Sequence, residues 1–289
     1  MNVFCTVSFA ALIAVCWSTE CGDISYAKKS PLELVTSRNE SFVFPWNALI
    51  KWKFRPIPIC LATIVQTDQW TTKSNNSNRV VTAAYCFKRD LTVSISKLDT
   101  FQVLVGFDYS AQPPVEGKAY QIKSKKIYKQ LHGTEKIKLG VAVLELKEPI
   151  MFTEKVRPIC VAKRGQKIPD NPLCFMPIYQ KDKRRVKDFI APVANHGNCA
   201  IWQDELGAAK GYCIYYSHQT AAKKLGSPLI CMVGKKLVQF GIYTTKFNSN
   251  YKGTQKASSI GYANDVTLLT SIIAGKLYET DPSSSALGY

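Results

Sequence analysis

The chain has 289 residues, of which 46% are hydrophobic, which is ample for a packed core. Lys and Arg number 38 against 21 Asp and Glu, so the formal net charge is +17. With only three His and no C-x-x-C pair, a zinc site is not expected. Beyond the first 17 residues, no stretch is long and apolar enough to span a bilayer.

The N-terminus begins with the apolar run MNVFCTVSFAALIAVCW, which carries no charged side chain. It is short for a spanning helix and has the length of a signal-peptide core. The alternative is an N-terminal core helix, but the polar STECGD that follows favours export. We therefore predict a signal peptide over residues 1–19, and a polar, irregular extension over residues 20–41.

From residue 42 onward, short apolar runs alternate with turn residues, which predicts strands. Helical spacing of apolar residues is convincing only over residues 265–279, and residues 279–289 read as a disordered tail. A linker near residues 158–172 separates two halves. Many short strands and one terminal helix indicate an all-β barrel or sandwich. The predicted strands cover residues 47–54, 60–67, 79–87, 101–107, 120–128, 140–146, 236–245 and 257–263.

Ten cysteines in a chain with a predicted signal peptide indicate a disulfide framework and a secreted, extracellular protein. Cys5 and Cys16 would leave with the signal peptide, so an even number remains. Asn39 and Asn75 begin acceptor sequons, and export would make both glycosylation sites. The eight remaining cysteines are Cys21, Cys60, Cys86, Cys160, Cys174, Cys199, Cys213 and Cys231.

Basic residues gather in two clusters, KSKKIYK from Lys123 and KDKRRVK from Lys181. For a secreted protein, an anionic polysaccharide, a phospholipid surface or an acidic protein is a more natural partner than nucleic acid. The alternative for any single cluster is a solvated surface. If the first cluster is a strand, Lys123, Lys125 and Ile127 share one face, and Lys126 lies on the other. We expect the second cluster, with Lys183, Arg184 and Arg185, to lie in a loop.

Six motifs in order resemble those of the trypsin/chymotrypsin-like serine proteases, over roughly Phe44 to Tyr278. The resemblance implies two six-stranded antiparallel β-barrels with a C-terminal α-helix, in a domain over residues 42–278. The chain also resembles the inactive, secreted serine protease homologues of arthropods. The motifs are FPWNALI, CLATIV followed by VVTAAYCF, GVAVLEL, VRPICVA, KKLGSPLIC and IGYANDV.

The resemblance also implies how the eight cysteines pair. The family's further bridge beside the specificity pocket would need a cysteine near position 221, where this chain has Ala221, and no cysteine follows Cys231. Both partners of that bridge are therefore missing together. The implied bridges are Cys21–Cys160, Cys60–Cys86, Cys174–Cys231 and Cys199–Cys213.

The catalytic positions of the family hold unsuitable residues in this chain. The base, carboxylate and nucleophile positions are occupied by Tyr85, Gly140 and Leu225. A phenol keeps its proton until about pH 10, glycine has no side chain, and leucine has no transferable proton. His132, His196 and His218 match none of these positions. The surrounding positions differ too: Lys223 at the oxyanion hole, Lys224 at the activation latch, Gln219 at the pocket floor, and Thr245 and Lys246 along the substrate cleft.

We therefore expect a secreted, non-catalytic protease homologue that binds or regulates other proteins, in a proteolytic cascade, immunity or seminal fluid. We expect no cofactor and no metal. One alternative is a glycosaminoglycan or anionic-surface binder. Its candidate contacts are Lys123, Lys125, Lys126, Lys183, Arg184 and Arg185. The other alternative is an enzyme with rebuilt chemistry, for which the sequence offers no nucleophile and base pair.

Overall fold

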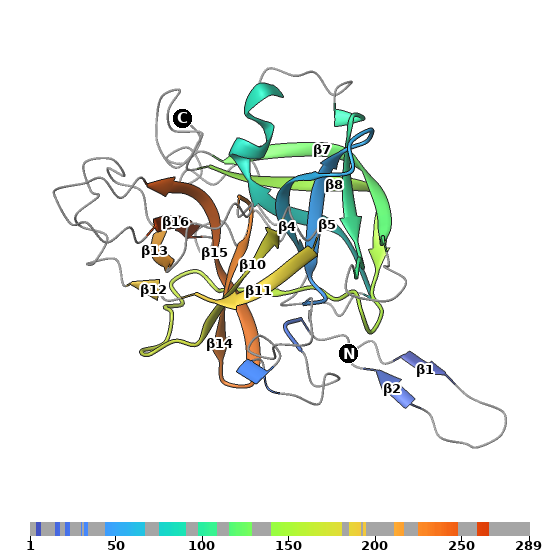
Figure 1. The fold of residues 1–289 in the computed structure, drawn as a ribbon. Helices are drawn as coiled ribbons and strands as arrows, with labels where there is room; N and C mark the ends of the chain where they lie inside the picture. The colour runs from blue at the N-terminus through green and yellow to red at the C-terminus, as the bar shows by residue number, and fades with distance from the viewer. Residues whose placement is uncertain are drawn as a thin grey trace, which may run out of the picture.

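The computed structural model describes the chain over residues 4–6, 15–17, 21–23, 30, 32–33, 44–66, 75–90, 98–108, 116–128, 140–180, 185–191, 193–194, 211–216, 225–247 and 259–265. Within these residues the protein is built almost wholly of strands, as the all-β prediction required. Two sheets lie side by side, one from each half of the chain (Figure 1).

The first half forms a closed six-stranded antiparallel barrel, in the order β3-β4-β5-β8-β7-β6. Side chains at every second position of a strand point to the same face, so Ala48 and Ile50 of β3 face the barrel interior together with Ala62 and Ile64 of β4. The opposite faces of β3 and β4 are also buried, because they pack against the second half. The strands are β3 Asn47–Trp52, β4 Pro58–Val65, β5 Asn76–Ala83, β6 Phe101–Val105, β7 Lys118–Tyr128 and β8 Val141–Met151.

The second half forms an eight-stranded sheet in the order β11-β10-β14-β15-β16-β13-β12, with β9 pairing in parallel beside β15. The predicted second closed barrel of six strands is not found among the described residues. Only Ala191 and Pro192 separate β11 from β12, so the two ends of this path are neighbours in the chain and the sheet curls back on itself. The strands are β9 Cys160–Val161, β10 Cys174–Gln180, β11 Arg185–Ile190, β12 Val193–Ala194, β13 Gly211–Tyr216, β14 Pro228–Val233, β15 Lys236–Phe247 and β16 Ser259–Asp265.

Some predicted boundaries were wrong. The prediction of a strand over 79–87 fails at its end, because Ala84–Asp90 forms the 3₁₀ segment η2. The prediction that KDKRRVK is a loop fails at Arg185, where β11 begins. The predicted linker near 158–172 contains β9. The predicted helix over 265–279 and the tail over 279–289 lie outside the described residues, apart from Asp265 in β16.

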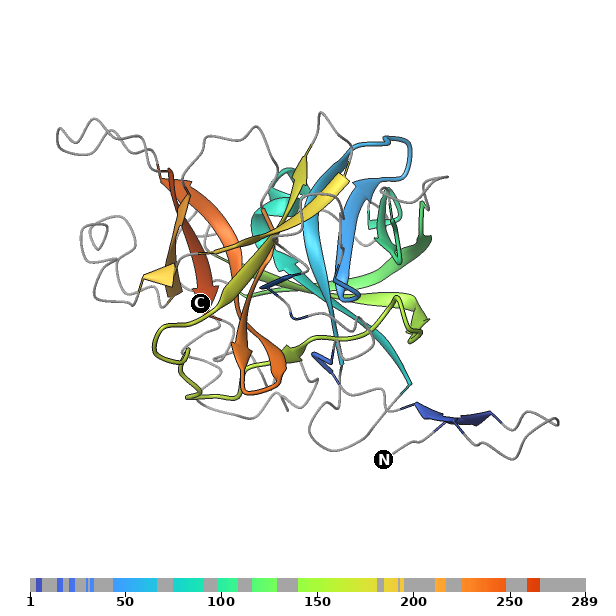
Figure 2. The same ribbon diagram turned by 60° about the horizontal axis from the view of Figure 1, so that its bottom comes forward.

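The N-terminal stretch predicted as a signal peptide contains β1 Phe4–Thr6 and β2 Val15–Trp17, which pair as an antiparallel hairpin. In Figures 1 and 2 this hairpin stands away from both sheets. Among the described residues, no helix has the length and apolar character needed to cross a membrane.

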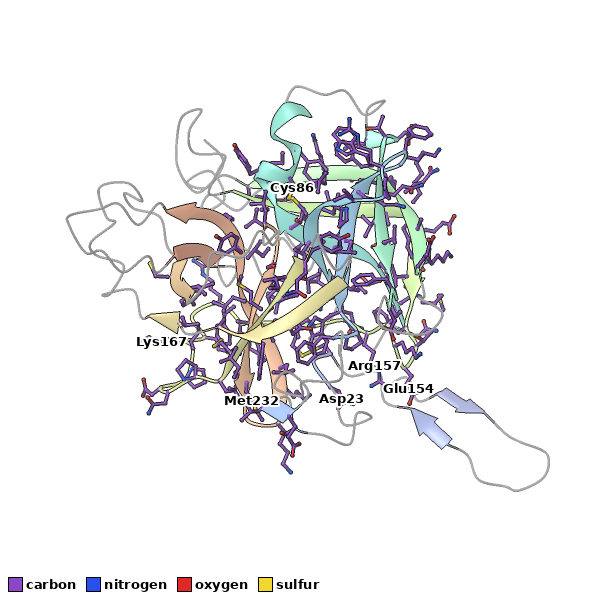
Figure 3. The ribbon with its side chains drawn as sticks, in the orientation of Figure 1. Asp23, Cys86, Glu154, Arg157, Lys167 and Met232 are labelled. Atoms are coloured by element: carbon purple, nitrogen blue, oxygen red, sulfur yellow. A yellow bond between two sulfur atoms is a disulfide. The ribbon has the colours of Figure 1, made fainter. Side chains whose placement is uncertain are left out.

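The described start of the predicted extension is fastened to the second half of the chain. The Cys21–Cys160 disulfide holds it beside β9, and the Gly22 amide and carbonyl bond to Pro158 and Leu237. Asp23 accepts a hydrogen bond of 3.3 Å from the largely buried guanidinium of Arg157 (Figure 3). The chain is thus anchored to the second half at residues 21–23, and most of the rest of the predicted extension lies outside the described residues.

A polar junction lies between the two halves. Asp188 of β11 is 3% exposed and Asn47 of β3 is 2% exposed. Burial raises the pKa of Asp188 to about 7, and the Phe44 amide and the Asn47 side chain offset part of that rise. Neither group reaches good hydrogen-bond geometry with the Asp188 carboxyl among the described residues. This carboxyl is therefore neutral in the folded protein over much of the acidic range.

Asp188 should make the protein less stable as the pH rises. An unfolded aspartate loses its proton near pH 4, whereas the folded one holds it to about pH 7. Between these values the folded state binds more protons, so the free energy of unfolding falls with pH, by about 3 kcal/mol from pH 5 to pH 8 for this group. In urea unfolding, the free energy of unfolding of Asp188→Asn should equal that of wild type at pH 5 and exceed it at pH 8.

The exposed Asp170→Asn variant is the matched control and should follow wild type at both pH values. A constant difference between Asp188→Asn and wild type across this pH range would contradict the assignment.

Candidate functional site

The position expected to hold the base lies at the start of η2, directly after β5. Tyr85 is half-buried there, and its neighbour Cys86 forms the disulfide with Cys60 of β4 (Figure 3). The Thr82 hydroxyl donates to the Leu61 carbonyl at 2.6 Å and lies 3.4 Å from the Cys86 sulfur. The Tyr85 turn is thus fixed to β4 by a covalent bond and a hydrogen bond.

The position expected to hold the carboxylate is adjacent to this turn. Gly140 directly precedes β8, and its carbonyl accepts a hydrogen bond of 2.9 Å from the amide of Ala84. The position expected to hold the nucleophile comes from the other half of the chain. The Leu225 carbonyl accepts a hydrogen bond of 2.9 Å from the amide of Leu61. The fold therefore brings all three predicted positions to one place.

The side chains at these positions have no set of groups for acyl transfer. Leu225 is partly buried and packs, together with Cys86, against the apolar cluster between the two halves and against the interior of the first barrel. Gly140 leaves a backbone carbonyl where a carboxylate would orient a base. A phenol, a hydrogen and an isobutyl group occupy the three positions, so no nucleophile is paired with a base as a triad requires.

The glycine that follows Leu225 is a structural requirement of this turn. Gly226 has φ +82°, and a Cβ atom there would overlap the Leu61 carbonyl oxygen and the Thr82 hydroxyl. Its amide donates to the Tyr243 carbonyl at 2.9 Å. Only glycine fits where the second half approaches β4 so closely. Sequence reasoning did not single out Gly226, although its place between Leu225 and Ser227 in the motif was the available signal.

Ser227 is the hydroxyl nearest in sequence to the nucleophile position, but it faces the protein interior. Its side chain is fully buried and donates a hydrogen bond to the carbonyl of Pro177 in β10. Its backbone carbonyl accepts from the Tyr243 amide at 2.8 Å. This hydroxyl links β10 to the turn and is not presented to a substrate.

A second phenol, which the sequence reading missed, lies beside the Gly140 position. Tyr128 ends β7 and pairs with Val141, the residue after Gly140. Burial raises the pKa of Tyr128, and the positive charge of Arg79 partly opposes this rise. Tyr128 packs in the same inter-half cluster as Leu225. Because its hydroxyl stays protonated at neutral pH, Tyr128 cannot serve as a base in place of a histidine.

Several predicted site residues cannot be placed with these. Lys223, Lys224 and Gln219 lie outside the described residues, and so does Asn39. Thr245 and Lys246 lie in β15, which fixes their backbone only. Asn75 is half-buried just before β5, and its side-chain oxygen accepts a hydrogen bond of 3.1 Å from Asn76. No group of three or more His, Cys, Asp or Glu able to hold a metal ion occurs in the described part of the chain.

Three of the four predicted disulfides are present, Cys21–Cys160, Cys60–Cys86 and Cys174–Cys231. Cys213 is also disulfide-bonded, and its predicted partner Cys199 lies outside the described residues. These bridges hold β9 to the N-terminal segment, β4 to η2, and β10 to β14. Two of them therefore support the strands that approach Leu225.

The family model described as Trypsin matches residues 59–273, which is more than half of the chain. The chain belongs to the trypsin family. This trypsin-family domain accounts for the closed first barrel, the disulfides and the convergence of Tyr85, Gly140 and Leu225. The match begins just before Cys60 and extends through β16 into the stretch predicted as a helix.

The close approach at Gly226 predicts a large cost for any side chain there. Gly226→Ala should lower the free energy of unfolding by about 3 kcal/mol. The added methyl group would overlap the Leu61 carbonyl, and alanine would also be held at a positive φ. Gly165 has a similar φ of +79° and open space around it, so Gly165→Ala is the matched control. The control should lose only about 1 kcal/mol, which is the cost of the left-handed backbone alone. Equal losses in urea unfolding would show that the turn does not approach β4 closely.

Proposed function

We propose that this trypsin-family chain is a secreted, non-catalytic homologue that acts as an extracellular binding or regulatory protein. The observation that carries the proposal is the convergence of the three catalytic positions with Tyr85, Gly140 and Leu225 in them. The three positions lie together, as they would in a working site. Their side chains supply neither a nucleophile, nor a base, nor a carboxylate to orient one.

The buried surroundings of the site support this reading. Leu225 packs against the apolar cluster between the two halves and the interior of the first barrel, and Tyr128 is half-buried against the same inter-half cluster. Apolar packing of this kind stabilises the junction but provides no proton acceptor. Restoring one group would not restore catalysis, because triad members act as a unit.

Secretion is supported by the apolar run over residues 1–17 and by the disulfides. Structural disulfides persist in oxidising compartments and are rare where thiols are kept reduced. Three bridges among the described residues, and Cys213 in a further one, favour an extracellular protein. A role in a proteolytic cascade, immunity or seminal fluid follows by analogy with inactive arthropod homologues.

The structure gives less support to a polysaccharide site along β7. Lys123 donates to Glu145 at 2.8 Å, and the Lys125 ammonium lies 5.2 Å from the Phe87 ring centre. A bulge between Ile122 and Ser124 places Lys123 outward, so the predicted sharing of a face by Lys123, Lys125 and Ile127 was wrong. Of these three lysines, Lys126 alone is exposed without an ion pair among the described residues.

The proposal predicts that a fluorophosphonate probe does not label the purified protein. Leu225→Ser should remain unlabelled as well, since neither Tyr85 nor Gly140 can activate the new hydroxyl. An active trypsin-family protease serves as the positive control. Stoichiometric labelling of the wild-type protein, detected by intact-mass spectrometry, would disprove the non-catalytic role and favour rebuilt chemistry.

A further inference from the structure

The tip of the hairpin between β3 and β4 presents an unusually exposed aromatic side chain. The Arg55 amide donates to the Trp52 carbonyl at 3.1 Å, which closes a four-residue turn with Lys53 and Phe54 at its centre. Phe54 is 87% exposed, whereas the other exposed large hydrophobic residues in the described part of the chain reach at most 50%. Among the described residues the only ring contact of Phe54 is with Lys53, whose ammonium lies 6.0 Å from the ring centre, so solvent covers most of the phenyl ring.

The turn that carries Phe54 is held in place from below. The Lys53 amide donates to the Thr100 carbonyl at 2.7 Å. Trp52 stacks on Phe101 with ring centres 4.2 Å apart, and Phe101 meets the buried Phe87 edge-on at 5.2 Å. A turn fixed in this way loses little conformational entropy when a partner binds its tip.

The same turn carries positive charge that its own surroundings leave unneutralised. Lys53 and Arg55 of the turn follow Lys51 near the end of β3 at alternate positions, and none of the three makes an ion pair with another described residue. The acidic group next to Thr100 is Asp99, and it is paired with Lys147 at 3.0 Å. By contrast, Lys118 and Lys123 of β7 each have a glutamate partner.

We propose that the Lys51–Arg55 turn docks an extended acidic segment of a partner protein, which places an apolar side chain against Phe54. Acidic side chains would complement the three cations, and an aromatic ring that loses water on contact is the usual energetic centre of a protein interface. A sulfated polysaccharide would use the cations but gain little from the phenyl ring. This inference deepens the proposed binding role and rests on it.

The test uses the secreted, disulfide-bonded protein and a fluorescein-labelled peptide in which one Leu and one Tyr lie within a run of Glu. Fluorescence anisotropy at low salt should show saturable binding. Phe54→Ala should weaken binding by about tenfold or more, and Lys53→Glu with Arg55→Glu should abolish it. A peptide with Ser in place of Leu and Tyr should bind wild type and Phe54→Ala equally weakly.

The control carries the same change of charge at two exposed lysines elsewhere, Lys155→Glu with Lys235→Glu, and should bind the peptide within about twofold of wild type. Thermal unfolding checks that every variant is folded. Equal weakening in the control, or no effect of Phe54→Ala, would overturn the proposal. Loss of heparin retention without any effect of Phe54→Ala would assign the turn to sulfated polysaccharide instead. If the fluorophosphonate probe labels the protein and the peptide still binds the turn, only the non-catalytic role is disproved.

Discussion

The structure depends on the close approach of the Leu225–Ser227 turn to strand β4. The Leu61 amide bonds to the Leu225 carbonyl, and Gly226 lies against the Leu61 carbonyl where no Cβ fits. Ser227 extends the contact to Pro177 of β10. This turn joins the closed barrel to the second sheet, so its backbone is required for packing whatever side chain occupies position 225. That requirement explains how the backbone geometry of this site can persist whatever side chains it carries.

Under the proposed non-catalytic role, the outer surface rather than the junction between the halves would carry the binding. Around Leu225 and Tyr128 the junction is apolar and half-buried, and it stabilises the contact between the two halves. A buried acidic group, Asp188, faces Asn47 across the junction between the halves and couples its packing to pH. On the outer surface, the rigid hairpin tip at Phe54 combines exposure with positive charges that no described residue pairs.

The sequence reading failed where local signals conflict with tertiary packing. Strand β10 contains Pro177, a residue that usually argues against a strand, yet β10 pairs with both β11 and β14. Strand β11 begins within a basic run that reads as a loop. On β7, Ile122 and Ile127 both reach the barrel core although five positions apart, which simple alternation forbids and the bulge permits.

By itself, the sequence determined the all-β class, the strands of the first barrel, the family and the disulfides Cys21–Cys160, Cys60–Cys86 and Cys174–Cys231, because ordered motifs and cysteine positions are local features of the chain. It also singled out Tyr85, Gly140 and Leu225, which the structure brings together. Only the tertiary structure decided that Ser227 is buried, that Gly226 allows no side chain, that Asp188 lies buried between the halves and that Phe54 is exposed. Each of these properties depends on which distant residues surround a side chain, and no local pattern records that.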